Sequence, residues 1–245
     1  MRFKLDFVTD RSELNIDYRR FVLSYIKHSL ADSVNGNLLD RYYADTNTKD
    51  FTWTLIVSKP KFTKEKLQFA NNRFTLVFSA DDKRQTGMYL MLAFLNQKNK
   101  RYPAEDGNYI YLQNIVQLNQ KEANDTTVRF VTMPGSSLVV REHHRETNRD
   151  EYYTCEDEGY ADKLEQALKT QAEMAGFAEA AVAGIKVHSV AGRKVVVKHY
   201  GIYLDATIAD FTVSGEREIL QHFYLNGACS RRSAGFGMLD IVEEG

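Results

Sequence analysis

Hydrophobic and charged residues alternate at the start of the chain, where Phe3, Leu5 and Phe7 are separated by charged side chains. Such alternation predicts a strand with one buried face. A helix is expected to follow and to reach about Asp32, because large apolar residues recur there every three or four positions. This apolar stripe contains Tyr18, Phe21, Val22, Tyr25, Ile26 and Leu30.

Four further elements complete the pattern of the first half. β-branched and aromatic residues are concentrated in segments 51–57 and 73–79, which predicts two strands. Apolar spacing predicts a helix over about 82–97, and alternation predicts a strand over 109–117. The order strand, helix, strand, strand, helix, strand is that of the ferredoxin-like unit.

A second copy of this order is expected after a polar linker near residues 119–125. Its predicted elements are a strand at 127–133, a helix at 157–175, strands at 185–190, 194–200 and 203–213, a short helix ending at Gly227 and a final strand at 238–242. Ala191, Gly192 and Arg193 resemble a hairpin turn between two of these strands. Because the unit needs one strand fewer, we interpret residues 185–200 as a protruding hairpin.

The predicted fold is therefore α+β, with two tandem ferredoxin-like (RRM-like) βαββαβ domains over residues 1–120 and 126–245. The 245 residues are 43% hydrophobic and 27% charged, which excludes disordered and collagen-like classes. No apolar run approaches the roughly 20 residues that span a bilayer, so no membrane partner is expected. Two cysteines, Cys155 and Cys229, are too few for a disulfide framework, which predicts a cytoplasmic protein.

Charge is nearly balanced over the whole chain, with a net value of -1. A protein devoted to nucleic acid usually carries a basic excess, so this balance argues mildly against such a partner. The local distribution is uneven, because residues 142–165 are strongly acidic whereas 59–66 and 184–237 are basic. One side of the molecule can therefore be cationic.

The segment 227–237 carries the most specific chemical signal. Its glycines allow backbone conformations with positive φ and a close approach to another chain. Successive exposed N–H groups can hold phosphate oxygens, and Arg231 and Arg232 add fork-shaped donors. We therefore predict a surface loop that binds a phosphate backbone. The residues expected to contact the backbone are Gly227, Ser230, Arg231, Arg232, Ser233, Gly235, Phe236 and Gly237.

A glycine-rich loop that ends in Gly-Phe-Gly, after a short helix and before a last strand, resembles the hallmark of the RAMP superfamily. Within it, the chain is most similar to the CRISPR-associated endoribonucleases that cut precursor CRISPR RNA within its repeats. Residues 201–213 resemble the strand that precedes the last helix in that family. Residues 128–140, with Pro134, resemble the first strand of its second domain.

This resemblance implies cleavage without a metal or cofactor, by attack of the ribose 2′-hydroxyl on the adjacent phosphate. The products would be a 2′,3′-cyclic phosphate and a 5′-hydroxyl. Histidine suits the proton transfers because its pKa lies near neutrality. His28, the only histidine of the first half, is therefore the predicted catalytic residue, facing a cleft between the domains. Tyr42 or Tyr43 could add a hydroxyl, and Lys49 a positive charge.

The remaining histidines support weaker hypotheses. His143 and His144 lie among glutamates, but neighbouring residues of an extended chain point to opposite faces, so we expect no metal site. In the predicted hairpin, Lys194 and Lys198 accompany two histidines and could bind an RNA stem through its phosphates.

The sequence favours a metal-independent endoribonuclease whose partner is CRISPR repeat RNA. A non-catalytic RNA-binding RAMP subunit of a CRISPR effector complex is the alternative, and it would need no catalytic histidine. A third hypothesis is a tandem ferredoxin-like scaffold that binds a small acidic ligand. Near-neutral net charge favours this third hypothesis, and the arginines of the loop oppose it.

Overall fold

The computed structural model describes residues 1–33, 38–44 and 48–243. The first half forms an antiparallel sheet with the strand order β3-β6-β1-β8-β7. These strands are β1 (Arg2–Thr9), β3 (Phe51–Val57), β6 (Arg73–Ala80), β7 (Arg101–Pro103) and β8 (Tyr109–Leu118). Apart from the short edge strand β7, this is a ferredoxin-like sheet, as predicted.

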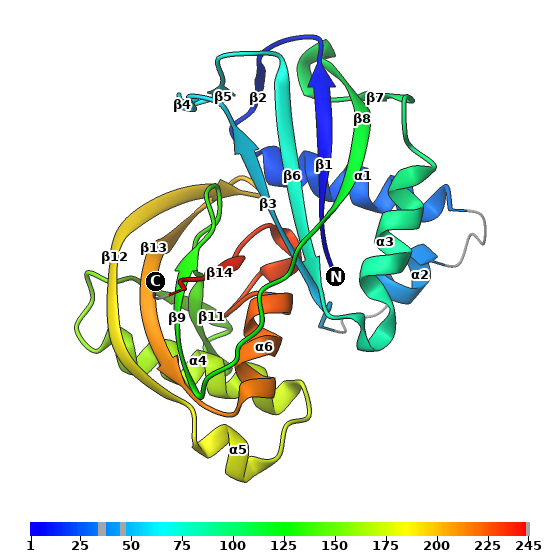
Figure 1. Cartoon of the computed structure of the whole chain (residues 1–245). Helices are drawn as coiled ribbons and strands as arrows, with labels where there is room; N and C mark the ends of the chain where they lie inside the picture. The colour runs from blue at the N-terminus through cyan, green and yellow to red at the C-terminus, as the bar shows by residue number, and fades with distance from the viewer. Residues whose placement is uncertain (34–37, 45–47, 244–245) are drawn as a thin grey trace.

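Two helices, α1 (Tyr18–Ala31) and α3 (Thr86–Leu95), cover one face of this sheet (Figure 1). The apolar stripe of α1 is buried as predicted, and Tyr25 stacks on Phe94 with ring centroids 5.9 Å apart. Segment 38–43 forms the short helix α2 (Leu38–Tyr43). A small sheet contains β2 (Glu13–Asn15), β4 (Lys61–Phe62) and β5 (Lys66–Gln68), and the 3-10 turns are η1 (Asp82–Arg84) and η2 (Glu105–Gly107).

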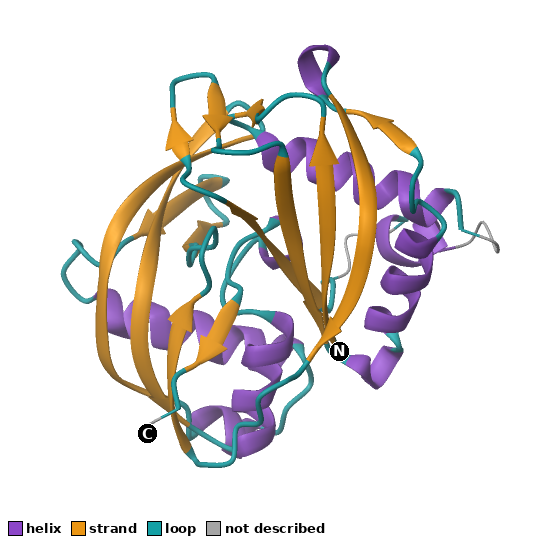
Figure 2. Cartoon of the chain, turned by 45° about the horizontal axis from the view of Figure 1, so that its top comes forward, coloured by secondary structure: helices purple, strands orange, loops and turns teal. Residues whose placement is uncertain are grey.

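The second half contains a sheet with the order β12-β13-β9-β14, which is again the ferredoxin-like arrangement. Its strands are β9 (Thr127–Thr132), β12 (Lys186–His199), β13 (Ile202–Ser214) and β14 (Leu239–Ile241). The helices are α4 (Tyr160–Met174), α5 (Glu179–Ala183) and α6 (Arg217–Asn226), and η3 (Arg232–Ala234) lies in the glycine-rich loop. Each half has its own buried core, and both sheets can be seen in Figure 2.

The predicted hairpin turn at Ala191–Arg193 is wrong, because β12 runs through these residues as one strand paired with β13. Gly192 instead permits close packing, since a Cβ there would lie 2.5 Å from the Ile208 carbonyl oxygen. The chain turns at Tyr200 and Gly201, whose φ angles of 52° and 80° fit a two-residue hairpin turn. The strands β12 and β13 are therefore the second and third strands of the unit, not an addition to it.

The additional hairpin lies earlier, where β10 (Val140–His144) pairs with β11 (Arg149–Tyr153). Its side chains are mostly exposed and charged, so no alternation of apolar residues indicated a strand. This hairpin stands between β9 and α4 in the chain, and it forms one wall of the site described below.

The two halves are joined by buried polar contacts as well as by apolar packing. The guanidinium of Arg2, on β1, donates to the Tyr224 carbonyl at 3.1 Å and also to the Leu239 carbonyl. It lies 3.8 Å from the centroid of the Tyr224 ring. No helix in the described part of the chain is long and apolar enough to cross a membrane.

Candidate functional site

The glycine-rich loop, residues 227–237, connects α6 to β14 along the junction of the two halves. Its backbone has positive φ at Gly227, Gly235 and Gly237, and also at Cys229 and Arg231. Two residues of β3 hold it in place. Thr52 Oγ1 donates to the Phe236 carbonyl at 2.8 Å, and the Trp53 indole N–H donates to the Ser233 carbonyl at 2.9 Å.

Much of this loop is buried, in contrast to the surface loop that we predicted. The Phe236 ring is fully buried, lies 5.6 Å from the His199 ring and is covered by the Arg19 guanidinium at 4.3 Å. Arg19 also donates to the Gly235 carbonyl. The Phe236 ring is therefore not available to contact RNA, because it docks the two halves.

One side of the loop forms the floor of a cavity of about 640 Å³, here called the interdomain pocket. Its walls are α4, the β10–β11 hairpin and the segment around Thr48. Among its lining residues, five are basic and one, Glu142, is acidic. The basic residues are Lys49, Arg141, Lys163, Arg231 and Arg232. Ser230 and Ser233 also line it, so four of the predicted loop residues meet here.

Arg232 lies at the floor of this pocket and is only 9% exposed. Its guanidinium makes one long hydrogen bond of 3.4 Å, to the Asn226 carbonyl. It forms no ion pair with any residue that the structure describes. Burial lowers the pKa of Arg232 to about 10, which leaves the side chain charged at neutral pH. An anion is the partner that such a buried cation lacks.

Arg231 points to the β10–β11 hairpin and belongs to a polar network there. Its Nη2 donates to the Tyr152 hydroxyl at 2.9 Å and lies 3.9 Å from Asp150. Asp150 also accepts from Arg141 at 3.1 Å and contacts His143 Nδ1 at 2.8 Å. Burial opposes ionisation of Asp150, but the hydrogen bonds from His143 and Arg141 outweigh it and lower the pKa of that carboxyl.

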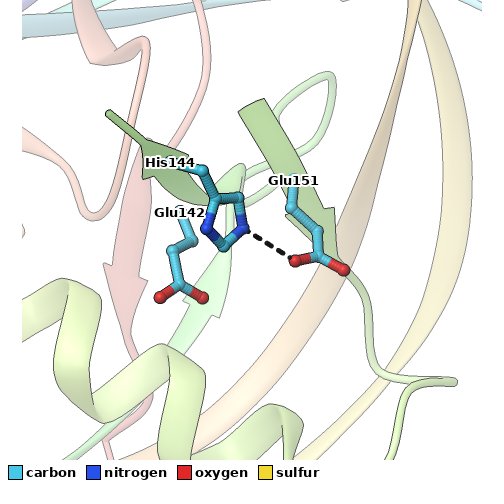
Figure 3. A group of neighbouring side chains, drawn as sticks. All are labelled: Glu142, His144 and Glu151. Carbon is cyan, nitrogen blue, oxygen red and sulfur yellow. Dashed lines mark hydrogen bonds and ion pairs between the residues drawn. The ribbon is translucent and has the colours of Figure 1, made fainter. Parts of the chain in front are cut away.

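The opposite face of the hairpin carries Glu142, His144 and Glu151 (Figure 3). Their ligand atoms lie within 4.8 Å of one another, and His144 Nε2 contacts Glu151 at 3.0 Å. These carboxylates already have partners. The Lys163 ammonium lies 2.6 Å from Glu142. The Tyr153 hydroxyl is within hydrogen-bond distance of both Glu142 and Glu151. His143 and His144 do point to opposite faces. The expectation of no metal site rested on neighbours in sequence, whereas Glu151 comes from the paired strand, where it lies opposite Glu142.

His28 does not face a cleft between the halves, so that prediction is wrong. It lies in the last turn of α1, with its ring 5.0 Å from the ring of Tyr102 on β7. The strands β3 and β7 are opposite edges of the sheet, roughly 19 Å apart at about 4.8 Å per strand. The loop contacts the β3 edge, and the other end of α1, through Arg19. His28 is not among the residues that line the interdomain pocket.

The other predicted catalytic residues lie in different surroundings. The Tyr42 hydroxyl donates to Thr86 Oγ1 at 3.1 Å inside the first half and does not line the pocket. Tyr43 lies between two ammonium groups, with Lys27 and Lys49 at 4.8 and 4.9 Å from its ring centroid. Burial raises the pKa of the Tyr43 hydroxyl, and burial together with Lys27 lowers the pKa of Lys49. Of these residues, only Lys49 lines the pocket.

The two lysines predicted to bind an RNA stem lie elsewhere. Lys194 forms an ion pair with Asp205 at 2.8 Å, and this hydrogen bond raises its pKa. Lys198 lines a second cavity of about 890 Å³ between β12 and the β3 edge of the first sheet. That cavity is largely apolar, with Leu55, Val195 and Tyr203 among its lining residues. The structure therefore does not bring these lysines together with Arg231 and Arg232.

Solved structures share the fold of this chain over almost their whole length. "An RAMP protein binding different RNA substrates" has a TM-score of 0.81 and 19% identity, with 99% of this chain and 100% of that chain covered. "Characterization of a Cas6-related gene from Pyrococcus furiosus" has a TM-score of 0.78 and 18% identity, with 100% and 99% covered. A structure described as "CRISPR associated protein Cas6" has a TM-score of 0.71 and 17% identity, with 99% of each chain covered.

These likenesses confirm the tandem ferredoxin-like fold. No curated protein matches the chain at a significant level of sequence similarity. The family model described as "CRISPR associated protein Cas6, C-terminal" matches residues 118–241, just over half of the chain and the part that contains the glycine-rich loop. The chain therefore belongs to the Cas6 family of CRISPR-associated repeat-processing proteins.

Proposed function

We propose that the chain binds CRISPR repeat RNA in the interdomain pocket and cuts it by attack of a ribose 2′-hydroxyl on the adjacent phosphate, without a metal ion. The products are a 2′,3′-cyclic phosphate and a 5′-hydroxyl. The observation that carries the RNA-binding part is Arg232, a buried cation at the pocket floor without an ion-pair partner among the described residues. An RNA phosphate supplies the negative charge that this site lacks.

The surrounding residues fit a phosphate backbone rather than a small acid. Basic side chains line the pocket from both halves, Lys49 from the first and Arg141 and Arg231 from the second. Such a spread suits several phosphates of one strand better than a single carboxylate. Ser230 and Ser233 offer hydroxyl donors beside the arginines. The small-ligand hypothesis is accordingly the weaker one.

One observation favours the alternative, a non-catalytic RNA-binding subunit of a CRISPR effector complex. The histidine predicted to catalyse cleavage, His28, packs on Tyr102 at the far edge of the first sheet. A cleavage assay separates the two functions, because both require the cationic pocket and only one requires proton transfer.

Substitution of Arg232 by Met should weaken binding of repeat RNA by about 10–100-fold, since a hydrogen bond to a charged group contributes about 1.5–3 kcal/mol. The slope of log affinity against log salt should become shallower by roughly 0.7 units. The melting temperature should not fall, because the variant no longer buries an unpaired charge. Fluorescence anisotropy at several salt concentrations and a thermal melt measure these quantities.

Arg129→Met is the matched control, since it removes the same charge from the exposed face of β9, where Arg129 pairs with Asp210 at 2.6 Å. It should change RNA affinity by less than about threefold. Equal losses of affinity in the two variants would mean that only net charge matters, and would contradict a phosphate site at Arg232.

The chemistry is tested with repeat RNA in EDTA and with a 2′-deoxy substitution at the nucleotide before the cut. We expect cleavage to persist in EDTA and to stop with the deoxy substrate, because the 2′-oxygen is the nucleophile. The 5′ fragment should end in a cyclic phosphate, detected by its mass. Loss of cleavage on chelation would contradict the metal-free mechanism and would direct attention to Glu142, His144 and Glu151. RNA binding without any cleavage would favour the alternative function.

A further inference from the structure

His143 combines three properties of a proton-transfer group, and nothing in the sequence suggested it. Its side chain lines the interdomain pocket, which holds Arg141, Arg231 and Lys49 as well. It is 42% exposed, so a substrate can reach it. The residue directly opposite it on β11 is Asp150, whose carboxylate contacts the imidazole at 2.8 Å.

Asp150 fixes the orientation of the imidazole. The contact involves Nδ1, so in the neutral ring Nδ1–H donates to Asp150 and Nε2 keeps its lone pair as an acceptor. Asp150 is itself held by Arg141 at 3.1 Å and by the Tyr152 hydroxyl at 3.3 Å. An imidazole positioned by a carboxylate, with its other nitrogen unprotonated, is the arrangement that general bases of hydrolytic enzymes use.

The positively charged side chains near His143 can hold the phosphate that reacts. Arg141 is two residues away on β10 and shares Asp150 with it, and Arg231 of the glycine-rich loop lies 3.9 Å from that carboxylate. A phosphate held by Arg141 and Arg231 would be next to the imidazole. Guanidinium groups also stabilise the extra negative charge of a pentacoordinate phosphorus.

We propose that His143 is the catalytic base of this chain, that it accepts the proton of the attacking 2′-hydroxyl through Nε2, and that Asp150 is its positioning residue. This inference rests on the proposed function and replaces His28 in it. The 2′-oxygen forms a bond to phosphorus while the bond from phosphorus to the 5′-oxygen breaks. The 2′ proton moves to His143, and the 5′-oxygen takes a proton from the Lys49 ammonium. The imidazolium proton then returns to the Lys49 amine through water, so no proton is gained or lost overall.

The test compares two adjacent histidines. His143→Gln should reduce the single-turnover cleavage rate by roughly 10²–10⁴, the usual effect of losing one proton-transfer group. RNA affinity should change by less than about threefold. His144→Gln is the matched control, because His144 is on the same hairpin and also contacts a carboxylate, but points to the opposite face and does not line the pocket. It should cleave at nearly the wild-type rate.

Two further measurements separate chemistry from structure. Added imidazole should restore part of the activity of His143→Ala, which a purely structural role would not allow. Asp150→Asn should slow cleavage in the wild-type background but have no further effect in His143→Ala, because the carboxylate acts through the imidazole.

The possible outcomes distinguish failure of the role of His143 from failure of the proposed reaction. A wild-type rate in His143→Gln, with cleavage intact in the parent protein, would overturn the role of His143 and leave the proposed function standing. Equal losses in the variants of His143 and His144 would also overturn it, since both would then reflect the hairpin alone. Absence of cleavage in the wild-type protein, with RNA still bound, would overturn the proposed reaction together with this inference.

Discussion

Substitution of Gly235 by Ala should lower the free energy of unfolding by about 2–5 kcal/mol. Gly235 has a φ of +86°, where a side chain strains the backbone by about 1–2 kcal/mol. A Cβ there would also lie 2.7 to 2.9 Å from three ring atoms of Trp53. Trp53 is fully buried and donates to the Ser233 carbonyl, so its ring cannot move without breaking that hydrogen bond. Overpacking of this kind adds about 1–3 kcal/mol.

Gly176→Ala separates the backbone strain from the overpacking. Gly176 has nearly the same φ, +87°, but no atom lies within 4 Å of the position of its Cβ. This variant should lose only the backbone contribution of about 1–2 kcal/mol. Urea unfolding followed by the fluorescence of Trp53, the single tryptophan, measures both variants. Equal losses would show that Trp53 yields freely, and that the glycine-rich loop is not held by β3 as the structure indicates.

Acidification should destabilise the fold, with a loss of about 4 kcal/mol in unfolding free energy between pH 7.5 and pH 5. Burial, then Arg231 and Arg19, lower the pKa of His199 to about 4, and burial and Arg232 do the same for His222. Both groups titrate near 6.5 in the unfolded chain, so the unfolded state binds more protons between about pH 4 and 6.5. Stability is therefore complete above pH 6.5 and is lost as the pH falls, by about 2 kcal/mol per histidine at pH 5.

Urea unfolding at the two pH values tests this expectation. His199→Phe and His222→Phe should each remove about half of the difference, because phenylalanine fills a similar space and binds no proton. A double variant with the same pH dependence as the wild-type protein would contradict the assignment. The acid sensitivity also concerns the site, since His199 packs on Phe236 and His222 is close enough to Arg232 to be affected by its charge.

Local patterns were sufficient for the elements that have one buried face. The alternation at Phe3, Leu5 and Phe7 and the apolar stripe of α1 report burial directly, since period two and period 3.6 place residues on one side of a strand or helix. The order of these elements then specified the tandem fold. The short segments of the β10–β11 hairpin gave no such signal, because their side chains are mostly exposed.

The sequence alone did not show where the chain turns, because a glycine can either form a turn or allow close packing within a strand. Gly192 was interpreted as a turn residue, but it is a strand residue that lets the β13 backbone approach. The true turn contains Tyr200, a residue that does not favour positive φ. Only the paired strand shows which of the two glycines, Gly192 or Gly201, faces a backbone and which turns the chain.

The sequence by itself determined the two ferredoxin-like units, the family resemblance and the importance of the loop with Arg231 and Arg232. The tertiary structure decided which side chains share a site, because Lys49, His143 and Arg232 come from segments that are far apart in the chain. It placed His28 at the far edge of the first sheet, and Phe236 in the junction between the halves. Periodicity reports whether a residue is buried, whereas proximity across the junction depends on how the two sheets are docked.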